Sequence, residues 1–116
     1  MTNYRLRKLK RNFLLKSLIL HLLDSWTIFT INPKKELYEL RISPLAAQKT
    51  MTDLIAIGYV KEVVSWRGRE YSTLSIVEHP SLFREAIILT DKGSQIVREG
   101  KGLRQIKEIW QNVNRG

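Results

Sequence analysis

The sequence contains no cysteine, which excludes disulfides, thiolate metal sites and a cysteine nucleophile. Its two histidines, His21 and His79, are too few and too far apart to predict a set of metal ligands. It also lacks a glycine-rich phosphate loop, a nucleophile elbow and a segment of paired carboxylates. We therefore expect neither an enzyme nor a bound metal or cofactor.

No apolar run reaches the length of about 20 residues that a membrane-spanning helix needs. Lys16 and His21 interrupt the longest run, residues 13–23. The basic segment before this run imitates a signal peptide, but no small-residue cleavage site follows, and Trp26 and Phe29 stand there instead. We expect a buried helix in a cytoplasmic protein that does not engage a membrane; an amphipathic helix lying on a membrane is the alternative.

What the chain does have is the composition of one folded domain with a large positive charge. Its 116 residues suit a single domain, and 43% hydrophobic with 27% charged residues is ordinary for a globule. The 20 basic residues outnumber the 11 acidic ones, which gives a net charge of +9. An excess of this size favours an acidic polymer or surface as the partner, namely nucleic acid or anionic lipid.

The positive charge is concentrated at the amino terminus. Residues 1–16 contribute +6, residues 17–66 sum to zero, and residues 67–116 add +3. We expect residues 1–8 to form a basic arm ahead of a first helix at 9–24, and the arm to contact DNA phosphates. A minor-groove arm and a solubilising tail are the alternatives. The candidate backbone contacts are Arg5, Arg7, Lys8, Lys10 and Arg11.

Two Pro-containing signals predict a helix-turn-helix over residues 33–57. Asn32-Pro33 starts a short helix that runs to Arg41, with Leu37, Tyr38 and Leu40 as inward candidates. Ser43-Pro44 starts the next helix, which ends before Gly58. Spacings of three and four place Ala47, Thr50, Met51 and Leu54 on the inner face of this second helix.

The outer face of the helix at 44–57 carries side chains that can read bases. Gln48 can bind adenine through two hydrogen bonds, Lys49 can meet guanine or phosphate, and Thr52 can approach a thymine methyl group. Small Ala46 would allow close approach to the groove wall. Ser43 caps the helix, and a helix amino terminus can also hold a phosphate. An ordinary solvated helix face is the alternative.

Residues 59–90 have a β pattern, which we interpret as an antiparallel wing. A strand at 59–66 leads into a turn at 67–70, a second strand spans 71–77, and 85–90 is a buried strand. The segment between them, about residues 78–84, fits a third strand, a longer wing or a loop. The candidate wing contacts to DNA are Arg67, Gly68 and Arg69, although turns are often polar without a ligand.

The predicted order of helix, short strand (26–31), two helices, hairpin and carboxyl-terminal helices (91–114) is the layout of a winged helix-turn-helix. Two segments carry a resemblance to the winged-helix regulators of bacteria and archaea, including the MarR-like and PadR-like families. They are Ser43-Pro44 through Leu54-x-x-x-Gly58-Tyr59-Val60, and Ile88-Leu89-Thr90-Asp91-Lys92-Gly93. The resemblance spans about residues 10–115. It implies a mainly helical α+β fold in which residues 44–57 enter the major groove.

The terminal helices have more apolar residues than one small core requires, which favours a homodimer interface. The alternative is a monomer whose last helix folds back over its own core. The candidate interface residues are Leu14, Leu18, Leu22, Leu103, Ile106, Trp110 and Val113.

These features together predict a dimeric, sequence-specific protein that binds double-stranded DNA, most simply a transcriptional regulator at the nucleoid. Two other functions remain open at this point. One is a non-specific architectural binder of nucleic acid, and the other is a winged-helix module that binds protein. The sequence does not identify a small-molecule effector.

Overall fold

The computed structural model describes residues 3–25, 33–63, 65–66, 69–70 and 87–115. Over these residues the chain is mainly helical with small antiparallel sheets, which confirms the α+β class. The helices are α1 (Asn3–Ser25), α2 (Pro33–Glu39), α3 (Pro44–Ala56), α6 (Asp91–Glu99) and α7 (Leu103–Arg115). The strands are β1 (Val60–Glu62), β2 (Ser65–Trp66), β3 (Arg69–Glu70) and β4 (Ile87–Leu89). The predicted strand at 26–31 and the segment 71–86 lie outside the described residues.

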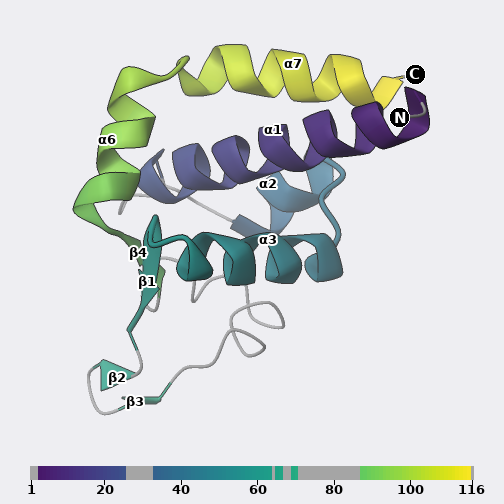
Figure 1. Ribbon diagram of the computed structural model, residues 1–116. Coiled ribbons are helices and arrows are strands. Elements are labelled where there is room, and N and C mark those ends of the chain that lie inside the picture. Colours follow the sequence, from purple (N-terminus) through teal and green to yellow (C-terminus); the bar gives the residue numbers. More distant parts are fainter. Residues whose placement is uncertain (1–2, 26–32, 64, 67–68, 71–86, 116) are drawn as a thin grey trace.

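Helix α1 lies at the centre of the molecule. Figure 1 shows α7 along one side of α1 and α3 along the other, and α1 contacts α6 and β4 as well. Helices α1 and α7 run in opposite directions, so the two ends of the chain meet at one end of the molecule (Figure 1). Because α1 is covered on two sides, it buries more apolar residues than a surface helix would. Leu18 and Leu22 are both completely buried.

Helix α1 begins earlier than the sequence predicts. It starts at Asn3, not at residue 9, so the residues expected to form a basic arm are its first turns. The first turn contains no acidic residue to complement the positive end of the helix dipole. The basic side chains therefore stand on a helix, at fixed spacings, and not on a flexible segment.

Helix α3 forms largely as its end signals predict. The Ser43 hydroxyl accepts a hydrogen bond from the Ala46 amide at 3.1 Å. At the other end Gly58 has φ +81°, the left-handed conformation that favours glycine. The buried residues of α3 are the four predicted, Ala47, Thr50, Met51 and Leu54. Both ends are thus set by local residues.

The turn between α2 and α3 is made without a glycine. The Ile42 amide donates to the Leu37 carbonyl at 2.9 Å, and the Arg41 amide donates to the Tyr38 carbonyl at 3.0 Å. This pair of bonds is the Schellman ending of a helix, in which the left-handed residue is usually glycine. Arg41 occupies that position with φ 57°. As a result α2 ends at Glu39, two residues before the predicted end.

The inner face of α2 differs from the prediction at one residue. Leu37 and Leu40 are buried as expected, but Tyr38 is 82% exposed. Tyr38 lies beside Leu37 in sequence, and successive residues of a helix point about 100° apart. The short α2 therefore buries Leu37 and Leu40 alone of the three.

The junction between β4 and α6 is tied to the end of α3. Strands β1 and β4 pair antiparallel, with Val60 opposite Leu89. The Thr90 hydroxyl accepts from the Gly93 amide at 3.2 Å and donates to the Gly58 carbonyl oxygen at 2.6 Å. A Cβ atom on Gly93 would lie only 1.9 Å from the Tyr59 carbonyl oxygen. Thr90 and Gly93 therefore let α6 begin directly against the backbone that follows α3.

The hairpin of the predicted wing is described in part. Strands β2 and β3 pair antiparallel, with Ser65 opposite Glu70 and Trp66 opposite Arg69. The predicted turn at 67–70 is too long, because Arg69 and Glu70 belong to β3. Arg67 and Gly68, predicted as wing contacts, lie outside the described residues. Figure 1 shows β2 and β3 projecting away from the helices.

Candidate functional site

A pocket of about 810 Å³ opens between α1, the α2–α3 turn and α7. Five of the residues that line it are basic and none is acidic, so we call it the basic pocket. Four of these five come from α1, and the fifth is Arg41 from the turn. The lining residues are Arg7, Lys8, Lys10, Arg11, Asn12, Leu15, Arg41, Ile42, Ser43, Ala46, Trp110, Val113 and Asn114.

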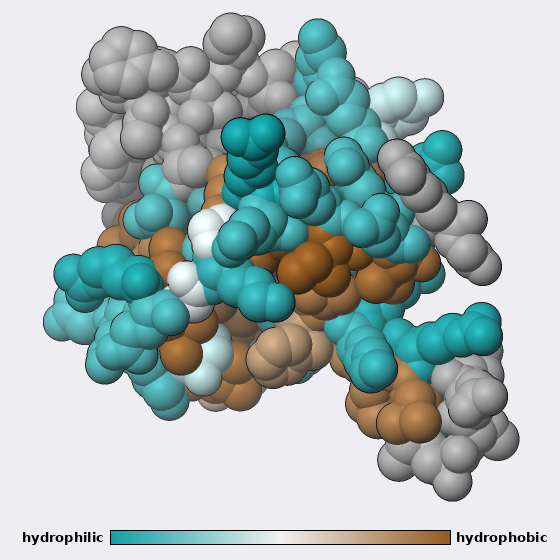
Figure 2. Space-filling view, turned by 90° about the horizontal axis from the view of Figure 1, so that it is seen from above, coloured by the Kyte–Doolittle hydropathy of each residue, from teal (hydrophilic) through white to brown (hydrophobic). Residues whose placement is uncertain are grey.

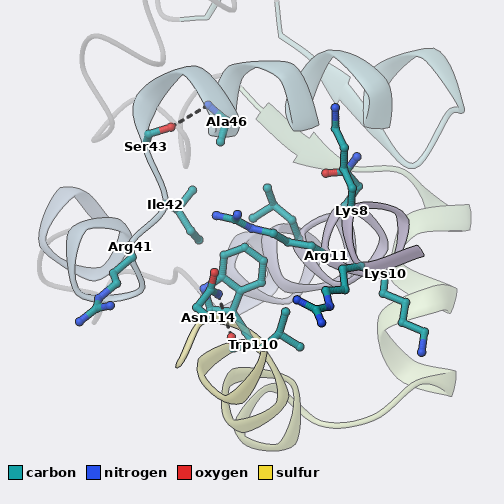
Figure 3. Close-up of a pocket in the computed structure, with 13 residues that line it drawn as sticks. Lys8, Lys10, Arg11, Arg41, Ile42, Ser43, Ala46, Trp110 and Asn114 are labelled. Carbon is teal, nitrogen blue, oxygen red and sulfur yellow. Dashed lines mark hydrogen bonds between the residues drawn. The ribbon is translucent and has the colours of Figure 1, made fainter. Parts of the chain in front are cut away.

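Arg11 extends into the centre of the basic pocket. Figure 3 shows its guanidinium between Ile42 and Trp110, whereas Lys10 and Arg41 point outward at opposite edges. The guanidinium carbon of Arg11 lies 5.6 Å from the centre of the Trp110 ring, within the range of a cation–π contact. The ring thus supports one face of the guanidinium, and the N–H donors at its edge stay available to a ligand.

Trp110 and the wall around it are held by hydrogen bonds and an ion pair. The Trp110 indole donates to the Leu40 carbonyl oxygen at 2.7 Å, and the Asn114 amide donates to the Trp110 carbonyl oxygen at 2.8 Å. Lys107 of α7 meets Glu36 of α2 at 2.7 Å, with both side chains partly buried. The Trp110–Leu40 bond and the Lys107–Glu36 pair fasten α7 to α2 and to the residue that follows it, so the pocket walls are preformed.

The outer face of α3 adjoins the basic pocket through Ala46. Lys49 and Thr52 are exposed, as the sequence predicts, and Gln48 is half-buried. The Thr52 hydroxyl donates to the Gln48 carbonyl oxygen at 3.0 Å. Ala46 is partly buried and packs against the core, so it is less accessible than predicted.

The structure brings together two groups of predicted DNA contacts that lie far apart in the sequence. Four of the predicted backbone contacts, Arg7, Lys8, Lys10 and Arg11, come together with Ser43 and Ala46 of the helix-turn-helix. Arg5 is exposed but does not line the pocket. Sequence reasoning missed Arg41 and Ile42 as pocket residues, because the turn carries no motif that marks it.

The predicted dimer interface is wrong for most of its residues. Leu18, Leu22, Ile106 and Trp110 are at most 4% exposed within the single chain, and Leu14 and Leu103 pack against the same core. Helix α7 folds back onto α1, so each apolar seam covers the other. Val113 alone of the seven is classed as exposed, at 41%, and it lines the basic pocket.

A different apolar surface on α1 is exposed. Leu6, Leu9 and Phe13 are 45%, 54% and 74% exposed, and their spacings of three and four place them on one face of the helix. We call these residues the α1 stripe. Figure 2, which looks down on the molecule from above, shows hydrophilic side chains over much of that view with apolar surface between them.

In the described part of the chain, no group of three or more histidine, aspartate or glutamate side chains is placed to hold a metal ion. No described helix is both long and apolar enough to cross a membrane. Comparison with models of protein families, with curated proteins and with solved structures finds no match to this chain.

Proposed function

We propose that the protein binds double-stranded DNA as a winged helix-turn-helix, with α3 in the major groove. The observation that carries this proposal is the position of the cationic side chains of α1, which stand at the amino-terminal end of α3. Arg7, Lys8 and Arg11 share one pocket with Ser43 and Ala46, where α3 begins. Positive side chains beside a helix that enters a groove are suited to the phosphates along the groove edge.

The outer face of α3 and the cations of α1 suit different parts of DNA recognition, which supports the same proposal. The outer face of α3 presents Lys49 and Thr52 to solvent, with Gln48 half-buried beside them. These side chain types can discriminate base edges, while the α1 cations supply affinity that does not depend on sequence. A protein of this kind would act as a transcriptional regulator at the nucleoid, in the cytoplasm.

A two-fold dimer completes the proposal, because one recognition helix reads only a short sequence. Two copies of α3 would then lie about one helical turn apart on pseudo-palindromic DNA. The α1 stripe, Leu6, Leu9 and Phe13, offers exposed apolar surface on which a second copy can pack.

Selection of bound sequences from a random duplex pool tests the proposal. We expect a two-fold symmetric consensus that the protein binds at least about 1000-fold more tightly than random duplex. Gln48→Ala should weaken binding to the consensus far more than binding to random DNA. Arg7→Ala should weaken both alike and reduce the dependence of affinity on salt.

The same experiment separates the other two functions. Tight binding without any enriched sequence would favour a non-specific architectural protein. No binding to duplex at physiological salt would favour a module that recognises protein. Equal loss on all sequences for Gln48→Ala would exclude base reading by that side chain.

A further inference from the structure

The basic pocket has a second chemical character that phosphate contacts leave unused. Beneath its cations lie apolar side chains from three separate elements, namely Leu15 of α1, Ile42 of the α2–α3 turn, and Trp110 with Val113 of α7. Leu15, Ile42 and Trp110 are at most 6% exposed and form the floor, whereas Val113 is 41% exposed and presents the larger apolar surface to a ligand. A DNA phosphate would meet the cations but would gain nothing from this floor.

The size of the pocket suits a small molecule. Its volume of about 810 Å³ falls within the range of roughly 300–1,000 Å³ that is usual for small-molecule sites. Such sites combine mostly apolar walls with a few polar groups that orient the ligand. Here the polar groups are basic side chains together with Ser43, Asn12 and Asn114.

We propose that the basic pocket binds an organic anion, in which one carboxylate, sulfonate or phosphate group is attached to an aromatic or branched aliphatic body. The body packs on Val113, which is 41% exposed, and over the small exposed edges of Leu15 and Ile42. The anionic group meets the guanidinium of Arg11, which lies between Ile42 and Trp110 (Figure 3). A guanidinium binds such groups through two parallel hydrogen bonds.

The site is built before the ligand arrives. The Trp110 ring is fixed by its 2.7 Å hydrogen bond to the Leu40 carbonyl oxygen, and the ring in turn supports Arg11. Little ordering is then needed on binding, which favours affinity. The remaining cations, Lys8, Lys10 and Arg41, raise the positive potential at the rim, and the amino-terminal end of α3 adds to it.

Arg41 supplies a separate indication that the pocket is used. Its backbone has φ 57°, a conformation that disfavours residues with a Cβ atom and that glycine adopts freely. Arginine at this position places a cation at the pocket edge at a cost to the fold.

The proposed site does not depend on DNA binding, since its ligand chemistry follows from the pocket alone.

The test uses 8-anilinonaphthalene-1-sulfonate as the probe, added to the full chain labelled with ¹⁵N. We expect saturable binding at one site, with shifts of the Trp110 indole signal and of the amides of residues 42, 43, 45, 46 and 110–114. N-phenyl-1-naphthylamine has the same rings without the sulfonate, and inorganic phosphate has the charge without the rings. Each should bind at least about tenfold more weakly than the probe.

Variants assign the anionic group to Arg11. Arg11→Met keeps the aliphatic part of the side chain and should weaken the probe about fivefold or more, whereas Arg11→Lys should restore part of the affinity. Arg98→Met is the matched control, because Arg98 is an exposed cation on α6 outside the pocket. Arg41→Gly should weaken the probe more modestly without lowering the midpoint of thermal unfolding, so it reports on binding in a chain that folds well.

Four results would overturn the proposal. The first is equal affinity for the probe and its neutral analogue, which would leave only an apolar cavity. The second is equal affinity for the probe and inorganic phosphate, which would leave only a simple anion site. The third is a set of shifted amides elsewhere in the chain, and the fourth is unchanged affinity in both Arg11→Met and Arg41→Gly.

Discussion

The indole Nε1–H of Trp110 donates to the carbonyl oxygen of Leu40 at 2.7 Å, across 70 residues of sequence. This bond joins the last helix to the end of α2, next to the left-handed turn at Arg41. Trp110 is 1% exposed, so the hydrogen bond is formed away from solvent. The folding back of α7, the shape of the turn and the pocket between them therefore depend on one another.

Replacement of Trp110 by phenylalanine should destabilise the fold. Trp110→Phe keeps an aromatic ring but removes the indole N–H. The Leu40 carbonyl oxygen then loses its hydrogen-bond donor at a position away from solvent. We expect the free energy of unfolding to fall by about 1–3 kcal/mol, measured by urea denaturation. Val113→Ala, on the exposed side of the same helix, should change it by no more than about 0.5 kcal/mol. Equal effects of the two substitutions would contradict the structural role of the indole bond.

Gly93 should tolerate no side chain. The Cβ atom of Gly93→Ala would lie 1.9 Å from the Tyr59 carbonyl oxygen, and backbone on both sides would have to move. We expect a loss of about 3 kcal/mol or more, at the upper end of what overpacking costs. Gly102→Ala is the matched control, because a Cβ atom there meets nothing within 4 Å. Thermal unfolding of the two variants should separate them widely, and a stable Gly93→Ala protein would show that α6 does not sit against Tyr59.

The Thr90 hydroxyl should be needed for both of its hydrogen bonds. Thr90→Val has nearly the same shape but neither caps α6 through Gly93 nor donates to Gly58. The expected loss in the free energy of unfolding is about 1–3 kcal/mol. Thr90→Ser retains the hydroxyl and should recover most of this loss. If the valine and serine variants unfold at the same urea concentration, the hydroxyl bonds do not stabilise the junction.

The proposed dimer should depend on Phe13. Phe13 is 74% exposed and is the most exposed residue of the α1 stripe, so Phe13→Glu places a charge on the surface proposed for the second copy without touching the core. We expect the wild-type chain to sediment as a dimer at micromolar concentration and Phe13→Glu as a monomer. Tyr38→Glu changes an aromatic residue that is 82% exposed on α2, and it should leave the dimer intact. A wild-type monomer would remove the dimer from the proposed function.

The parts of the fold that the sequence predicts correctly are those set by neighbouring residues. Ser43-Pro44 and Gly58 mark the two ends of α3, and a helical period of 3.6 residues identifies its buried face. The amino-terminal turns of α1 were missed because a run of cations without an acid is unfavourable at that end of a helix. Their helical conformation is consistent with the support that α1 receives from α7, a contact between the two ends of the chain.

The basic pocket could not be predicted for a related reason. An apolar seam on a helix indicates that something covers it, but not whether the cover is a second chain or another part of the same one. The seam of α7 packs on α1 of its own chain, and this closure is what brings Trp110 beneath Arg11 and beside Ile42. Arg41 was missed because a left-handed turn is normally recognised by glycine.

Buried His21 should make stability depend on pH. Burial lowers the pKa of His21 below its ordinary value of 6.5, and the nearby Asp24 carboxylate partly opposes this shift. The folded state then binds the proton more weakly than the unfolded state. The contribution of neutral His21 is complete above pH 6.5 and is lost as the pH falls from there through the pKa of the folded state. In that window the free energy of unfolding should decrease by at most about 1.4 kcal/mol per pH unit from this one residue.

His21→Gln removes this titration, and the difference in stability between the two chains isolates it from every other ionising group. Urea denaturation at several pH values between 5 and 8 should show the wild-type advantage shrinking as the pH is lowered. Asp24→Asn removes the opposing carboxylate, so it should lower the pKa of folded His21 further and extend the loss to lower pH. A difference between wild type and His21→Gln that stays constant across this range would mean that His21 keeps its ordinary pKa in the folded chain.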